Sequence, residues 1–150
     1  NNYINLDLIN EATRVFGSQC IIGSIDYRYD PKKKSYNLYK DCGKKKITIN
    51  PKEWIPRLID SGIGELMITS IDNDGCLNGL DLNFIKYLKI KDNIPILIGG
   101  GVKDYKDFFN AFKKYNVSAV VSSSIYIFTE HTPHTIKKKL LKDKISIRVV

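Results

Sequence analysis

The chain has 150 residues, of which 43% are hydrophobic and 27% charged, and it carries a net charge of +8 at pH 7. This length and composition are typical of a globular domain with a buried core, and they exclude a disordered or low-complexity chain. No apolar run approaches the ~20 residues that cross a bilayer, and the N-terminus shows no signal peptide. We therefore expect no membrane partner.

The positive charge comes from 20 lysines against 4 arginines. Arginine is the usual residue for bidentate contacts to phosphates and bases, and no nucleic-acid motif accompanies the charge. We expect a solvated lysine surface that favours an anionic substrate, and no nucleic-acid partner. The three cysteines, Cys20, Cys42 and Cys76, show no CxxC spacing. They predict no disulfide framework, no zinc site and a cytoplasmic protein, with Cys20 as a small core residue.

Residues 6–16 have the apolar spacing of an amphipathic helix, which Gly17 ends. An apolar strand is predicted over residues 20–25, and residues 27–34 are predicted to form a polar loop. Two alternating runs, 35–39 and 46–49, then predict a β-hairpin inserted after the first strand.

The rest of the chain alternates helix and strand. Asn50-Pro51 and Thr132-Pro133 are helix starts, each with a capping residue followed by proline. Asp81 is predicted to cap a helix with Leu82, Ile85 and Leu88 turned inward. The elements predicted after the hairpin are a helix from 50 to 62, a strand at 65–71, a helix at 81–89, a strand at 96–98, a helix at 104–115, a strand at 119–121 and a helix from 132 to about 141.

This order gives four β/α units after a leading helix. A (β/α)8 barrel needs eight units and about 250 residues. The length therefore fits half a barrel or a small open α/β sheet, and strand spacing alone leaves both possible. We expect one domain over residues 1–150, with a leading segment at 1–19 and four parallel units at 20–150.

Two clusters of small residues follow consecutive strands: the glycines 99–101 and the serines 122–124. Glycines let the backbone approach a ligand and direct N–H groups at an anion, and barrel folds often bind phosphate with the loops after two neighbouring strands. The alternative is a tight turn and helix packing. Because both clusters fall at consecutive strand ends, we prefer a phosphate site.

Asp26, Asp72 and Asp74 are predicted at strand ends, where a partly desolvated carboxylate can act as general acid or base. Asp72 and Asp74 have a strong alternative role in a turn before Gly75. Asp26 has none and is the better catalytic candidate. Glu65 begins a strand and so is expected at the opposite end of the sheet, where the parallel strands start.

His131 and His134 have no partnered carboxylate or cysteine, so we expect no metal site, and nothing in the sequence indicates a cofactor.

Several motifs, in order along most of the chain, resemble the cyclase subunit of imidazole glycerol phosphate synthase. The match is to the C-terminal half of that family's (β/α)8 TIM barrel. The motifs are Phe16–Cys20, Ser24–Asp26, Gly64-Glu65, Thr69–Gly75, Gly79–Asp81, Ile94-Pro95, the glycine triplet, and the serine triplet continuing through Phe128.

The resemblance implies a lyase of histidine biosynthesis. Such cyclases take ammonia from a partner glutaminase, close the imidazole ring and release an aminoimidazole carboxamide ribotide. It implies that Asp26 is one of two catalytic aspartates, the other lying in the half that has no counterpart here. It implies a gate for ammonia at Glu65. The implied substrate and phosphate contacts are Asp74, Gly75, Gly100, Gly101, Ser123 and Ser124.

The sequence departs from that family in Cys76, where threonine is usual, in Ile127, where histidine is frequent, and in a longer segment 27–48. The longer segment resembles that of paralogues that supply ammonia for sugar amidation in surface-polysaccharide synthesis, and Cys76 also favours this alternative. A third possibility is a non-catalytic phosphate-binding half-barrel that dimerises. Because Asn1-Asn2 is not a usual translation start, we expect a fragment with weak or no activity alone, which associates with the missing N-terminal half or with itself.

Overall fold

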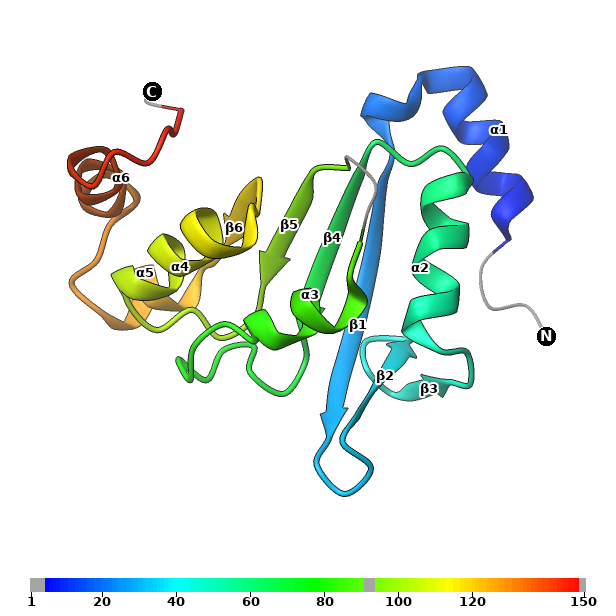
Figure 1. The fold of residues 1–150 in the computed structure, drawn as a ribbon, viewed down its shortest axis with the longest axis horizontal. Helices are drawn as coiled ribbons and strands as arrows, with labels where there is room; N and C mark the ends of the chain where they lie inside the picture. The colour runs from blue at the N-terminus through cyan, green and yellow to red at the C-terminus, as the bar shows by residue number, and fades with distance from the viewer. Residues whose placement is uncertain (1–4, 91–93, 149–150) are drawn as a thin grey trace.

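The structure, a computed structural model, describes residues 5–90 and 94–148, so the unusual start at Asn1-Asn2 lies outside the described residues. Figure 1 shows one curved sheet of six strands flanked by helices. The strands are β1 Ile22–Asp30, β2 Ser35–Lys40, β3 Lys45–Ile47, β4 Glu65–Ser70, β5 Ile96–Gly99 and β6 Ala119–Val121. The helices are α1 Leu6–Phe16, η1 Ser18–Cys20, α2 Pro51–Asp60, α3 Leu82–Leu88, α4 Tyr105–Tyr115, α5 Ser124–Phe128 and α6 Pro133–Lys142.

The sheet order is β3-β2-β1-β4-β5-β6. Strands β1, β4, β5 and β6 are parallel neighbours, and at least one helix follows each of them along the chain. The antiparallel β2 and β3 form the predicted hairpin after the first strand. The prediction of four parallel β/α units with a hairpin insertion is therefore confirmed.

The first strand differs from its prediction. We expected it to end at residue 25 and residues 27–34 to form a loop, but β1 continues to Asp30. It does so because β2 pairs with it, from Asp26 opposite Tyr39 to Asp30 opposite Ser35. A long polar-looking segment becomes a strand once a neighbouring strand satisfies its backbone N–H and C=O groups.

Three smaller details differ from the prediction or add to it. Leu82, Ile85 and Leu88 pack against the core as predicted, but the fully buried residue in the first turn of α3 is Phe84, which was not predicted. Cys20 is exposed at the end of η1 and is not a core residue. The short helix α5 was not predicted, because its five residues are too few for a recognisable periodicity.

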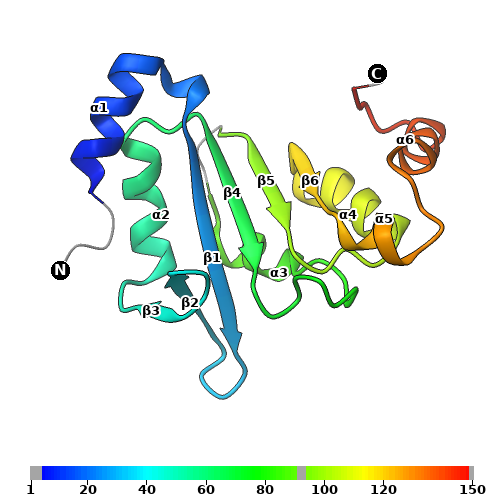
Figure 2. The same ribbon diagram turned by 180° about the vertical axis from the view of Figure 1, so that it is seen from behind.

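The two faces of the parallel sheet are unlike. Side chains alternate between faces along a strand, and in β4 the buried Leu66 and Ile68 alternate with the half-buried Met67 and Thr69. The buried side chains face the helices, and we call this side of the sheet the covered face. Figure 2 shows the other side of the sheet, where the strands lie in front of α3; we call it the open face. This is the arrangement expected of half a barrel, whose inner face has no closing half.

Helix α1 has the predicted amphipathic spacing and is capped by the Asn5 side chain, which accepts from the backbone N–H of Asp7 at 3.0 Å. Nevertheless no residue of α1 is buried. Leu8, Val15 and Phe16 are each more than 60% exposed. The helix therefore presents an uncovered apolar surface at one end of the molecule, opposite α6 (Figure 1).

The buried residues form a core between the covered face and its helices. One cluster joins the strands β1, β2 and β4 to α2 and α3, and others join β5 and β6 to α4 and α6. In the described part of the chain, none of the helices has the length and apolar content that crossing a membrane requires.

Candidate active site

Four residues of the open face lie at one level near the carboxyl ends of the parallel strands. Asp26 pairs in register with Thr69, Thr69 with Gly99, and Gly99 with Val121. Asp26 itself lies in the middle of β1, so its predicted position at a strand end was wrong. Asp26 nonetheless lies beside the carboxyl end of β4, because β1 extends beyond the ends of its parallel neighbours.

The carboxylate of Asp26 is partly desolvated and lies near a second negative charge. Burial raises its pKa above the usual range, and the negative charge of Asp74 raises it further. The fold thus brings together two of the three predicted aspartates. A carboxyl with a raised pKa retains its proton to higher pH than an ordinary one, which suits a group that must both donate and accept a proton.

The third aspartate, Asp72, pairs with a residue that the sequence analysis missed. Its Oδ1 lies 3.4 Å from Nε of Arg28. Arg28 follows Asp26 by two residues on the same face of β1, and its guanidinium lies 5.1 Å from the ring centroid of Tyr39. The i, i+2 spacing would have identified Arg28, had the strand been extended through it.

The backbone at Gly100 and Gly101 requires glycine. Both have positive φ, +87° and +97°. A Cβ on Gly100 would lie 2.5 Å from the carbonyl oxygen of Ser70, and one on Gly101 would lie 2.6 Å from Cβ of Asn73. The N–H of Gly79 also donates to the carbonyl of Gly101 at 2.6 Å. The glycine triplet is therefore packed tightly against the loop that follows β4.

Gly75 is different from these two glycines. It also has positive φ, +78°, but a Cβ there would meet nothing within 4 Å. Asp74 beside it is exposed, and its N–H donates to the carbonyl of Ser70 at 3.0 Å. The pair forms an exposed turn in the loop that follows β4.

The serine triplet leads directly from β6 into α5. Ser123 is the N-cap residue of this helix, yet its side chain makes no capping hydrogen bond. The side chain of Ser123 is exposed and that of Ser124 is half-buried. Because Gly99 and Val121 are paired, the glycine and serine segments leave the sheet from adjacent positions. We call Gly100, Gly101, Ser123 and Ser124 the Gly/Ser rim.

Glu65 lies at the other end of the same sheet. It is the first residue of β4 and pairs with Ile22, the first residue of β1. The prediction that Glu65 lies at the end of the sheet opposite to Asp26, where the parallel strands start, is confirmed. In residues 5–90 and 94–148, no three His, Cys, Asp or Glu side chains are grouped as a metal site would require.

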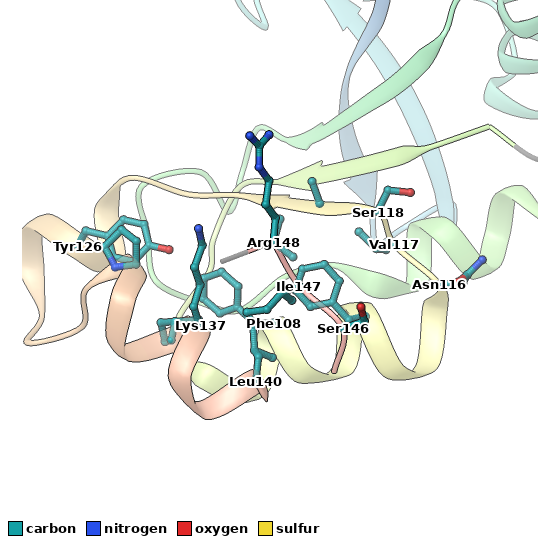
Figure 3. A pocket seen from close by; sticks show the side chains of 15 residues that line it. Phe108, Asn116, Val117, Ser118, Tyr126, Lys137, Leu140, Ser146, Ile147 and Arg148 are labelled. Carbon is teal, nitrogen blue, oxygen red and sulfur yellow. The ribbon is translucent and has the colours of Figure 1, made fainter. Parts of the chain in front are cut away.

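A hollow of about 470 Å³ lies away from these groups, between α4, α6 and residues 146–148 (Figure 3). Its lining is mainly apolar and includes Phe108, Leu140 and Ile147, with Lys137 and Arg148 also contributing. None of the predicted site residues lines it. It lies beside β6, the last strand of the sheet, and so belongs to the edge of the molecule rather than to the site.

Comparison with known proteins supports the resemblance seen in the sequence. The family model described as "Histidine biosynthesis protein" matches residues 2–132. The chain is 34% identical over 145 residues to imidazole glycerol phosphate synthase subunit HisF of Leuconostoc mesenteroides, covering 97% of this chain and 57% of that protein. The subunit of the same name from Dictyoglomus turgidum is 35% identical over 145 residues, with the same two coverages. The chain thus spans little more than half the length of these relatives.

Proposed function

The chain belongs to the histidine biosynthesis protein family, and from this premise we propose that it forms half of an imidazole glycerol phosphate synthase cyclase, the C-terminal half of the barrel. One observation carries the proposal. The strand register joins the carboxylate of Asp26, through Thr69, to the glycine triplet on a single level of the open face. This register supports a site in which Asp26 is the acid–base group and the glycine triplet is the anion-binding loop.

In this proposal Asp26 exchanges protons with the substrate during closure of the imidazole ring. The raised pKa of its carboxyl supports this role. Asp74 and Gly75 contact the substrate at the exposed turn that they form. The second catalytic aspartate implied by the resemblance belongs to the other half of the barrel, so we expect this chain alone to be weakly active or inactive.

The Gly/Ser rim binds one phosphate of the substrate. Glycines with positive φ expose backbone N–H groups to an anion, and the serine hydroxyls add further donors. In barrel folds a phosphate site at this position is common, formed by neighbouring strand–helix loops and a short extra helix. Helix α5 supports this comparison because it follows β6 directly.

The proposed partners follow from the uncovered parts of the half-barrel. Strand β2 pairs with β1 only over residues 26–30, so the edge of residues 22–25 has no partner from the hairpin. At the opposite end, β6 is the last strand of the sheet. Unpaired edges favour association with further strands. We propose that the other half of a barrel, or a second copy, covers them, and that a glutaminase delivers ammonia at the Glu65 end.

Titration calorimetry with a bisphosphorylated aminoimidazole ribotide tests the proposal. We expect the chain to bind it, Ser123→Asp to weaken binding at least tenfold by charge repulsion, and Asp26→Asn to retain binding. Ser118→Asp is the matched control. Ser118 is an exposed serine just before β6, whereas Ser123 lies just after the other end of the same strand. Equal affinities for Ser123→Asp and Ser118→Asp would contradict a phosphate site at the Gly/Ser rim.

Two other functions remain as candidates. Cys76, an exposed thiol beside Gly75, and the long hairpin of β1 and β2 are the departures that favour the paralogue that supplies ammonia for sugar amidation. The unpaired strand edges favour the non-catalytic half-barrel that dimerises. Ammonium-dependent turnover of the ribotide, measured after adding an N-terminal half from a relative, separates both from the cyclase: neither would release the carboxamide product.

A further inference from the structure

A second cavity, of about 590 Å³, lies beside the carboxyl ends of β1 and β4. It is bounded by the β1–β2 hairpin and by the chain between β4 and the first turn of α3. Tyr29 lines it and follows the buried Tyr27 by two residues, whereas Asp26 and Arg28 alternate onto the open face. The lining residues are Tyr29, Lys34, Tyr36, Ser70, Asp72, Asn73, Asn78, Gly79, Leu80, Asp81 and Asn83.

One wall of this cavity is aromatic and firmly held. Tyr29 and Tyr36 are directly opposite each other on β1 and β2, with ring centroids 5.0 Å apart. The Tyr36 ring also lies 4.7 Å from Phe84 and 4.9 Å from Tyr87. Tyr27, in the same aromatic group, is fully buried, but Tyr29 remains 45% exposed. The group therefore ends in an accessible ring at the cavity.

The other wall is polar and bears two carboxylates, those of Asp72 and Asp81. Asn78 and Asn83 are exposed amides in the lining. Asp72 is balanced by Arg28, as described above. The carboxylate of Asp81 accepts from the Tyr36 hydroxyl at 3.5 Å and from the Asn83 backbone N–H at 3.2 Å, and burial raises its pKa.

We infer that this cavity binds a carbohydrate, with the C–H face of a sugar ring on Tyr29 and its hydroxyls on the amides of Asn78 and Asn83. An exposed aromatic ring offers a flat surface for the apolar face of a sugar. Amide side chains both donate and accept, as adjacent hydroxyls require. The volume falls in the range of ligand sites. An anionic ligand fits less well, because the lining offers one lysine and two carboxylates.

This cavity is separate from the proposed cyclase site but adjoins it. Asn73 donates to the carbonyl of Gly79 at 3.4 Å, and both residues contact the space that a side chain on Gly101 would occupy. The inference does not depend on the cyclase proposal, because it uses the opposite face of β1 and a different set of donors.

Saturation-transfer NMR on the whole chain, with glucose, galactose and N-acetylglucosamine as probes, tests the inference. We expect transfer to the ring protons of at least one sugar, and affinity at least tenfold weaker in Tyr29→Ala. Tyr39→Ala is the matched control, because Tyr39 lies on the same hairpin but faces the other side of the sheet. Asn83→Ala should also weaken binding, whereas Asp26→Asn should leave it unchanged.

Absence of transfer from every sugar to the folded wild-type chain would overturn the inference, as would equal binding by Tyr29→Ala and the wild type. Loss of binding in Tyr39→Ala as well would overturn it by indicating non-specific aromatic contact. Circular dichroism establishes that each variant is folded. Calorimetry with the ribotide, run on the same samples, reports on the cyclase site independently, so the two proposals fail by different measurements.

Discussion

The two faces of the parallel sheet use the same strands for different purposes. On the covered face, Leu66 and Ile68 are fully buried beneath helices. On the open face, Met67 and Thr69 of the same strand are only half-buried, and Asp26 lies beside Thr69. Because successive side chains of a strand point to opposite faces, a residue that packs in the core and its neighbour that faces the site can be substituted separately. The covered face holds the fold together, and the open face can carry charged groups.

The largest expected effect separates the faces by their cost in stability. Ile68→Ala removes a fully buried side chain and should lower the free energy of unfolding by about 2–5 kcal/mol. Met67→Ala, its neighbour on the open face, should cost about 1 kcal/mol or less, because its side chain is already partly in water. Urea denaturation measures both. Equal losses would show that the open face is covered in solution, for example by a second copy.

A smaller expected loss of stability distinguishes two glycines near the site, Gly100 and Gly75, by how closely they are packed. Gly100→Ala combines a positive φ with a Cβ 2.5 Å from the Ser70 carbonyl, and we expect it to lose about 3 kcal/mol of stability. Gly75→Ala also has positive φ but an open surrounding, and should lose roughly 1–2 kcal/mol. Thermal unfolding by calorimetry tests this order. A Gly75→Ala variant as unstable as Gly100→Ala would mean that backbone conformation, rather than close packing, dominates at both positions.

The smallest effect concerns the charge on the open face. Because the folded-state pKa of Asp26 is raised, its contribution to stability is greatest when it is protonated and falls as pH rises through the raised pKa. Asp26→Asn should therefore increase stability at pH 7, by about 1 kcal/mol or less given its partial exposure. The gain should disappear near pH 3, where Asp26 is protonated in both states.

Melting temperatures across pH measure that gain, and Asp74→Asn is the informative companion. Removing the charge of Asp74 should bring the pKa of Asp26 closer to its usual range, which NMR titration of the Asp26 carboxyl can follow. An unchanged titration in Asp74→Asn would show that burial alone sets the proton affinity of Asp26. It would also remove the electrostatic argument that links the two aspartates in one site.

The sequence by itself determined the order of the β/α units, because their signals are local. Asp81 and the paired cap and proline at Asn50-Pro51 and Thr132-Pro133 all cap helices as predicted. Gly100 and Gly101 have positive φ, a conformation that favours glycine whatever the tertiary context. These features depend on neighbours in the chain, so they could be identified without the fold.

Only the tertiary structure decided the features that depend on distant partners. Residues 27–30 form a strand because they pair with β2, and the local sequence does not predict that pairing. The same pairing placed Arg28 on the face of Asp26 and within reach of Asp72. The pairing of Tyr29 with Tyr36 likewise arises from strand register, and the proximity of Asp26 to Asp74 arises from the pairing of β1 with β4, which precedes the loop of Asp74. Register is a long-range property, since it depends on which strand lies beside which, and that is fixed by the packing of the whole sheet.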